Sequence, residues 1–338
     1  MTNMGNIDNR SINLCTLFDS KFLLQGITLI RSVQKYASGK TKWTVLALDS
    51  TTEKYLKELT DVKIEVLTLE SMGDEDLLSL VGNRPWNEMC WTSAACLLRK
   101  VNQKIPTGSL AAYIDADCFF FNDIFATLSK LSGDRTIAIH EHRFSPDRAH
   151  WLPKSGRFNV GLVAGVKGTE FDKCLTRWRM QVLENCTVDK ELGRCGDQTY
   201  LNEWPHLYSG LHILDSKGIG VAPWNIGNYQ VHSFINQIYI DESPLHFYHF
   251  HSLQLGLISS RFQAFIPASG YKFKNREHEI IYRKYVMELS QSLNQILQEK
   301  SLVFNNDFMW WFKGLFTKRI LLHWNFQTKL EKMAFWNR

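Results

Sequence analysis

The sequence lacks long apolar runs, cysteine pairs and a strong excess of charge of either sign. No window reaches the about 18 consecutive apolar residues of a membrane-spanning helix, which excludes a membrane-embedded class. Residues 1–10 are polar and lack the apolar core of a signal peptide, so we expect a cytoplasmic protein. The seven cysteines are odd in number and include no Cys-x-x-Cys pair, which argues against a disulfide framework or a zinc ribbon. The net charge of +5 is mild, and we expect no nucleic-acid partner.

The first seventy residues alternate between predicted strands and predicted helices. Strands are expected at 11–18, 43–48 and 62–69, and helices at 22–36 and 53–59. The second helix follows Asp49, a residue type that caps helix N-termini. This alternation is typical of an α/β fold with a mostly parallel sheet flanked by helices. Ligands bind beyond the carboxyl ends of such strands, where Asp19 and Asp49 lie.

Two aspartates interrupt the apolar stretch 110–121, which predicts a buried strand. Side chains alternate along a strand, so Asp115 and Asp117 are expected on the same face with Ala116 between them. A desolvated carboxylate must be paired or must bind a cation. Two converging carboxylates suit a hard divalent cation such as Mn²⁺ or Mg²⁺. The alternative is that the two aspartates only begin a turn at the end of the strand.

The neighbouring segments supply further polar groups. Arg99 and Lys100 lie on a helix predicted from Trp91 to residue 105, from which they could reach a phosphate, although surface charge is the plainer interpretation for at least one of them. A strand at 136–139 ends in His140-Glu141-His142, which we interpret as a loop near the substrate cleft rather than a metal site. A glycine-punctuated strand is expected at 157–166 and a helix at 171–184.

Other polar positions are ambiguous when taken alone. Asp197 could simply cap a following turn of helix. His246, His249 and His251 lie among aromatic residues, and any of the three could join the aspartates as a metal ligand.

The C-terminal part has a different character, so we divide the chain into a domain at 1–255 and a helical extension at 256–338. Residues 275–300 predict an amphipathic helix. Residues 306–338 interleave aromatic and basic side chains, with only Asp307 and Glu331 opposing the cations. Such a tail suits a surface of anionic lipid headgroups, which would place the protein on the inner face of the cell membrane. The alternative is a tail that packs on its own domain or on a second subunit.

Several motifs occur in the order found in one enzyme family. Tyr113-Ile114-Asp115-Ala116-Asp117 resembles an Asp-x-Asp motif, and the helix at 88–101 resembles the helix that precedes it. Phe158-Asn159-Val160-Gly161, Asp197-Gln198, Trp224-Asn225 and His249-Phe250 resemble the later motifs. Over residues 12–253 the chain is similar to bacterial nucleotide-sugar-dependent glycosyltransferases of GT-A fold, related to family 8, that build cell-envelope polysaccharide. One departure is His251-Ser252, where the family has a small residue and glycine.

The resemblance implies an enzyme with a GT-A (Rossmann-like), mixed, mostly parallel sheet. It implies that Mn²⁺ or Mg²⁺ is held by Asp117, His249 and Asp115, with Asp115 alternatively on the ribose. The donor would be a UDP-sugar rather than a GDP-sugar, and the acceptor a saccharide or a lipid-linked saccharide. Further implied site residues meet the nucleotide and its diphosphate (Thr16, Asp19, Arg99 and Lys100) or the donor sugar (Asn159, Asp197 and Gln198).

The resemblance also implies retention of the anomeric configuration. An inverting enzyme would need a base, for which Asp197 or Glu141 is the candidate. Two other hypotheses stay open at this point. One is a metal-dependent hydrolase built on the aspartates and histidines, and the other is a catalytically silent scaffold that docks on a membrane.

Overall fold

The computed structural model describes residues 11–189, 193–258, 261–265 and 279–299. The chain divides into two compact units, Met1–His251 and Ser252–Arg338. The elements of the first unit up to the seventh helix are β1 (Ser11–Phe18), α1 (Leu23–Tyr36), β2 (Lys40–Ala47), α2 (Ser50–Glu58), β3 (Ile64–Leu67), α3 (Glu75–Leu78), α4 (Trp86–Lys104), β4 (Leu110–Ile114), β5 (Cys118–Phe120), α5 (Ile124–Thr127), β6 (Ile137–Glu141), the 3₁₀ helix η2 (Pro146–Trp151), α6 (Leu152–Ser155), β7 (Phe158–Val166) and α7 (Thr169–Glu184).

The first unit continues with short elements. These are β8 (Val188–Asp189), β9 (Arg194–Cys195), η3 (Gly196–Glu203), α8 (Trp204–Leu207), β10 (Leu211–Ile213), η4 (Ile226–Asn228), β11 (Val231–Phe234), β12 (Gln237–Ile240), β13 (Ser243–Pro244) and β14 (Phe247–His249). The second unit holds the antiparallel hairpin β15 (Gln254–Ile258) and β16 (Arg261–Phe265), followed by α9 (Glu279–Glu299).

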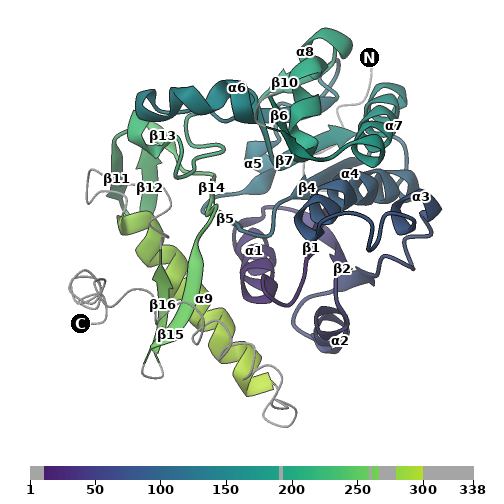
Figure 1. The fold of residues 1–338 in the computed structure, drawn as a ribbon. Helices are drawn as coiled ribbons and strands as arrows, with labels where there is room; N and C mark the ends of the chain where they lie inside the picture. The colour runs from purple at the N-terminus through teal and green to yellow at the C-terminus, as the bar shows by residue number, and fades with distance from the viewer. Residues whose placement is uncertain (1–10, 190–192, 259–260, 266–278, 300–338) are drawn as a thin grey trace, which may run out of the picture. The chain divides into compact units, whose positions relative to one another are not determined.

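A seven-stranded sheet in the order β10-β6-β7-β4-β1-β2-β3 forms the centre of the first unit (Figure 1). Only β7 runs antiparallel to its two neighbours, and all other neighbouring pairs are parallel. The helices follow the strands as in an α/β fold, because the right-handed crossovers that join parallel strands bring helices onto the faces of the sheet. The predicted fold class, a mostly parallel sheet flanked by helices, is confirmed.

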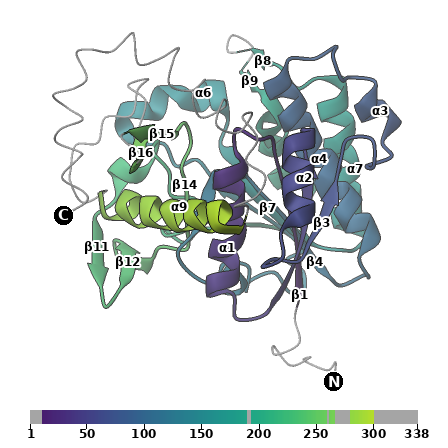
Figure 2. The same ribbon diagram turned by 90° about the horizontal axis from the view of Figure 1, so that it is seen from below.

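Side-chain alternation along β1 divides the core between the two faces of the sheet. Cys15 and Leu17 belong to the cluster that α4 and α7 cover, together with the buried Trp178 of α7. Figure 2 shows α4 and α7 side by side on that face. On the other face, Phe18 packs so closely against α1 that a Cβ at Gly26 would clash with its ring. Strand β1 is therefore packed on both faces up to its last residue, Phe18, and the loop that follows begins at the edge of the core.

The stretch 110–121 is not the single strand that its apolar pattern predicts. β4 ends at Ile114, the chain turns through Asp115-Ala116-Asp117, and β5 begins at Cys118. The Cys118 N–H donates to the Asp115 carbonyl over 3.0 Å, which closes the turn. β5 then pairs with β14 instead of continuing in the central sheet. The apolar side chains after the turn are buried all the same, because β14 and α1 cover them.

The boundaries of other helices and strands lie closer to those predicted from the sequence. The helix predicted from Trp91 begins at Trp86, and His140 and Glu141 belong to β6 rather than to a loop. Asp197 is not a helix cap, because Cys195 precedes the first turn of η3 and makes no side-chain capping bond. The predicted amphipathic helix is present as α9, in which Ile281, Tyr285 and Leu289 are buried. The aromatic and basic tail at 306–338 lies outside the described residues.

Within the described residues, no helix combines the length and the apolar character that a membrane crossing requires.

Asp49 caps α2 as the sequence predicts. Its side chain accepts a hydrogen bond from the Thr52 N–H over 2.8 Å and another from the Ser20 N–H over 2.8 Å. Burial alone would raise the pKa of Asp49, but these hydrogen bonds outweigh it and lower the pKa. The carboxylate therefore holds both the start of α2 and the loop after β1.

We expect Asp49→Ala to lower the free energy of unfolding by about 1 kcal/mol, the usual contribution of an N-cap. Asp49→Asn keeps an acceptor oxygen and serves as the control. Because the folded-state pKa is lowered, the stability from ionised Asp49 is present at neutral pH and is lost as pH falls through that pKa. Urea unfolding from neutral to acidic pH measures both effects. If the unsubstituted protein remained more stable than Asp49→Asn by the same free energy in acid as at neutral pH, this account would be contradicted.

Candidate functional site

Asp115, Asp117 and His249 converge just beyond the carboxyl end of β4. The His249 Nε2 atom lies 3.0 Å from Asp117 Oδ1 and 3.8 Å from Asp115 Oδ2. Two backbone hydrogen bonds hold the segments together: Phe250 N–H donates to the Asp117 carbonyl, and Asp115 N–H donates to the Gly161 carbonyl. The Asp115 and Asp117 side chains keep 30% and 17% of their surface exposed. The carboxylates are thus accessible from outside, whereas His249 is buried.

The three groups have different protonation tendencies. Burial raises the pKa of Asp115, although the charge of His249 opposes this. Burial also acts on Asp117, but the neighbouring His249 outweighs it and lowers the pKa of Asp117. For His249 itself, burial favours the neutral ring, yet the charge of Asp117 raises its pKa. The charge of Asp117 therefore favours a proton or a cation beside the His249 nitrogen that faces it.

Asn159 on β7 fixes the orientation of the His249 ring. Its Oδ1 atom accepts a hydrogen bond from the Gly161 N–H over 2.9 Å, which identifies this atom as the oxygen. The same oxygen lies 3.2 Å from His249 Nδ1, so that nitrogen carries a proton and donates it. In the neutral ring the lone pair is then on Nε2, the nitrogen that faces the two aspartates.

Gln198 and Asp197, at the start of η3, complete the cluster on its other side. Gln198 Oε1 accepts a hydrogen bond from Asn159 Nδ2 over 3.3 Å, and its Nε2 donates to the Ser155 carbonyl over 2.9 Å. Burial and the charge of Asp115 raise the pKa of Asp197 well above its usual value. The structure thus links Gln198 through Asn159 to His249 and brings Asp197 within the electrostatic influence of Asp115, although η3 lies far from β4 and β14 in the sequence.

Thr16 lies on β1, the strand next to β4, and Asp19 directly follows the carboxyl end of β1. Cys15 pairs with Tyr113, which places Thr16 beside the last residues of β4. Thr16 is buried, and among the described residues its hydroxyl has no hydrogen-bond partner. Asp19 accepts a hydrogen bond from Trp86 Nε1 over 3.1 Å. Within the described part of the chain, neither side chain forms a hydrogen bond or ion pair with the Asp115 cluster.

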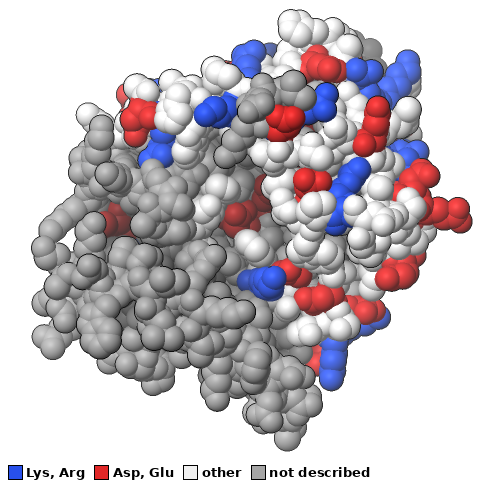
Figure 3. Space-filling view, in the orientation of Figure 1, with Lys and Arg blue, Asp and Glu red and all other residues white. Residues whose placement is uncertain are grey.

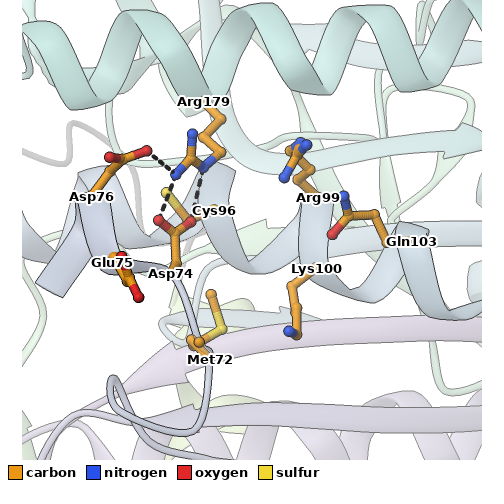
Figure 4. Close-up of a pocket in the computed structure, with 10 residues that line it drawn as sticks. Met72, Asp74, Glu75, Asp76, Cys96, Arg99, Lys100, Gln103 and Arg179 are labelled. Atoms are coloured by element: carbon orange, nitrogen blue, oxygen red, sulfur yellow. Dashed lines mark hydrogen bonds and ion pairs between the residues drawn. The ribbon is translucent and has the colours of Figure 1, made fainter.

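Arg99 and Lys100 lie elsewhere. They line a charged surface pocket of about 300 Å³ between α3, α4 and α7 (Figure 4). In that pocket Arg179 binds Asp74 and Asp76, and Arg99 lies 3.5 Å from Thr176 on α7. None of Asp115, Asp117 and His249 lines it. Over the described residues of the face in Figure 3, acidic and basic side chains are interspersed.

The histidine left open by the sequence is placed by the strand pairing. His249 lies on β14 opposite Cys118, and its ring faces the aspartates. His246 instead lies 2.8 Å from the Thr127 hydroxyl through Nδ1. His251 lies further out, with its ring 6.0 Å from that of His249 and 5.5 Å from Trp224.

Two neighbours of the cluster were not singled out from the sequence. The Tyr113 hydroxyl donates to Asp115 Oδ1 over 2.9 Å, and the alternation of strand side chains could have indicated it. Cys118 lies within reach of a metal held by Asp117 and His249. However, its thiol faces the Gly161 carbonyl at 3.6 Å, and burial raises its pKa well above the usual value. Cys118 is therefore a protonated thiol in this environment.

Comparison with known proteins assigns the chain to a family. No protein-family model matches it. The Bacillus subtilis protein YfnD, described as uncharacterized, is 32% identical over 258 residues, which cover 75% of this chain and 80% of YfnD. The chain belongs to the YfnD family. A second similar protein from that organism, YfnF, is 27% identical over 246 residues, which cover 70% of this chain and 80% of YfnF.

A solved structure shows the fold of this YfnD-family chain. The galactosyltransferase LgtC, in complex with donor and acceptor sugar analogues, matches with a TM-score of 0.50 and 14% sequence identity. The match covers 71% of this chain and 87% of LgtC. The YfnD-family chain therefore has the GT-A fold.

Gly161 is predicted to be essential for the geometry of His249. A Cβ at this position would lie 2.6 Å from Asn159 Oδ1 and 2.8 Å from His249 Nδ1. We expect Gly161→Ala to push the ring away from the aspartates and to weaken Mn²⁺ binding by about 10- to 100-fold, as for other groups that orient a ligand.

Titration with Mn²⁺, followed by electron paramagnetic resonance, measures this affinity. Gly168→Ala is the matched control, since a Cβ there would meet only the Val166 carbonyl at 4.0 Å. Equal Mn²⁺ affinity in the two variants would contradict the role assigned to Gly161.

Proposed function

We propose that this YfnD-family protein is a glycosyltransferase related to family 8. In this proposal it transfers a sugar from a nucleotide-diphosphate donor, a UDP-sugar rather than a GDP-sugar, to a saccharide or lipid-linked acceptor of envelope polysaccharide. The observation that carries it is the convergence of Asp115, Asp117 and His249 at the carboxyl edge of a GT-A sheet. In α/β sheets this edge is where ligands bind.

The side chains of the cluster fit a hard divalent cation, Mn²⁺ or Mg²⁺. Their donors are carboxylate oxygens and an imidazole nitrogen, with Asp117 Oδ1 and His249 Nε2 3.0 Å apart. Ligands on adjacent octahedral positions, each about 2.1 Å from a metal, are separated by about 3 Å. Asp117 and His249 would hold the ion, and Asp115 would share it or contact the ribose. When bound, the cation would neutralise the charge that develops on the leaving diphosphate.

The remaining residues have roles that follow from their contacts. Asn159 holds His249 in the tautomer that presents Nε2, and Gln198 holds Asn159 in turn. Asp197 and Gln198 would line the donor-sugar side. Thr16, with its buried hydroxyl, and Asp19 would meet the nucleotide from the neighbouring strand. We assign no role in donor binding to Arg99 and Lys100, because they line a different pocket.

The acceptor gives the C-terminal tail its proposed role. A lipid-linked acceptor is held at a membrane surface, and the basic and aromatic residues at 306–338 would attach the enzyme to the cytoplasmic face of that membrane. The protein would then be peripheral to the membrane and would meet both the soluble donor and the lipid-linked acceptor.

Asp117→Ala tests the metal site. We expect it to abolish the Mn²⁺-dependent thermal stabilisation by UDP-sugars, because bound ligand raises the apparent stability only when the complex forms. The fold should remain, since Asp117 lies in a turn at the edge of the sheet. Asp215→Ala is the control, as Asp215 is an exposed carboxylate paired with Lys130.

Undiminished Mn²⁺-dependent donor binding by Asp117→Ala would refute the proposed centre. A screen in which no nucleotide sugar binds would refute the transferase as a whole. Release of free sugar at the same rate without any acceptor would instead identify a hydrolase.

The configuration of the product tests the stereochemical proposal. We expect retention, with no enzymic base, so the anomeric coupling constants of donor and product in NMR spectra should indicate the same anomer. Inversion would require a base on the acceptor hydroxyl. Asp197 would then be the candidate, because Glu141 forms an ion pair with Arg157.

A further inference from the structure

A short hairpin that contributes no residue to the Asp115 cluster carries an unusual apolar tip. β11 and β12 pair in antiparallel fashion, with Phe234 opposite Gln237 and only Ile235-Asn236 between the strands. Phe234 is 65% exposed and Ile235 is 79% exposed. These are the two most exposed large hydrophobic side chains among the described residues. Figure 2 shows the hairpin projecting from its own unit.

The backbone conformation of the turn is unfavourable for an isoleucine at position 235. Ile235 has φ of 45° and Asn236 has φ of 63°, so both central residues are in the left-handed region. Two-residue hairpin turns of this kind favour Asn, Asp or Gly, whereas a β-branched residue at positive φ is a genuine outlier. Strain of this size is typically retained where the side chain has a use. An exposed isoleucine here contributes little to the core, which directs the search for its use outside the unit.

Polarity changes in steps along the hairpin. No Lys, Arg, Asp or Glu occurs from residue 231 to residue 240. Behind the tip, the His232 and Tyr239 rings stack across the strands with centroids 5.4 Å apart. At the base, Lys217 pairs with Asp241 at 2.9 Å and with Glu242 at 3.4 Å.

These steps match the profile of a bilayer surface. At about 3.3 Å per residue, the tip extends roughly 7–10 Å beyond the His232–Tyr239 pair. Apolar groups of interfacial proteins enter the headgroup and acyl boundary by about 5–10 Å. Amphipathic aromatic rings are enriched at the headgroup level, and charged groups stay in water.

We propose that Phe234 and Ile235 form a wedge that inserts into the interfacial layer of a lipid bilayer. A protein partner is the weaker explanation, because a specific interface needs about 800 Å² on each side and two side chains supply only part of that. The wedge can enter lipid without desolvating a charge. Stable attachment usually requires two signals, such as an apolar group and a basic segment, and this wedge supplies the apolar one. The inference uses the hairpin alone and is independent of the proposed metal site.

Vesicle partition of the full chain tests the wedge. We expect Phe234→Ser combined with Ile235→Asn to lower the partition into phosphatidylcholine vesicles by about tenfold or more, since two large apolar side chains lose their lipid contact. Salt at about 1 M screens the basic tail, because the Debye length is then about 3 Å. Asn suits the positive φ of the turn, so the thermal stability of the variant should equal or exceed that of the original chain.

Met180→Ser is the matched control, because Met180 on α7 is also a large apolar side chain and is 62% exposed, close to the 65% of Phe234. We expect its partition to be unchanged. Equal losses in the two variants, or no loss in the hairpin variant, would overturn the proposal. The proposal would also fail if light scattering showed a concentration-dependent dimer that the hairpin variant loses while its vesicle partition stays unchanged. The apolar tip would then contact a second copy of the chain rather than lipid.

A local probe separates the wedge from the tail. Ile235→Cys carrying an environment-sensitive nitrobenzoxadiazole group should shift its emission to the blue when vesicles are added, and Met180→Cys with the same label should not. Labelled unsubstituted protein gives the background from the native cysteines. Emission that is already blue-shifted without lipid, and unchanged on adding it, would show that another segment of the chain covers the tip and would overturn the proposal.

Discussion

The need to satisfy two carboxylates at the end of a buried strand governs the local structure. Asp115 and Asp117 could not simply continue the buried apolar strand β4, because an unpaired buried charge is strongly unfavourable. The chain therefore leaves the sheet at Ile114, turns, and meets β14, which brings His249 within 3.0 Å of Asp117. The same turn gives β5 a new partner and keeps its apolar side chains covered.

Asn159 connects three parts of the chain that have no local relationship. One side-chain amide contacts the backbone of its own strand at Gly161, the ring of His249 and the side chain of Gln198. Because its oxygen is committed to Gly161, the tautomer of His249 follows from it. A single residue thus links the donor-sugar side of the proposed site to the proposed metal ligand.

Much of the fold was predictable because its signals are local. The strand–helix alternation from β1 to β3 and the cap at Asp49 are confirmed, since apolar periodicity and capping act over a few residues. The sequence left a turn at Asp115 as the alternative to a continuous strand, because the apolar pattern is the same in one long strand as in two short strands that different neighbours cover. The pocket that Arg99 and Lys100 line was not predictable, because a helical sequence pattern does not indicate which neighbouring elements its basic side chains will meet.

The sequence by itself determined the α/β class and the presence of two carboxylates that needed a partner, because composition, period and charge are properties of short segments. Only the tertiary structure decided which histidine meets them. His246, His249 and His251 are chemically alike and close in sequence, but strand pairing with β5 sets the His249 ring 3.0 Å from Asp117, whereas His246 lies against Thr127. Its contact with Asn159 spans 90 residues, and contacts at such separation depend on the whole sheet.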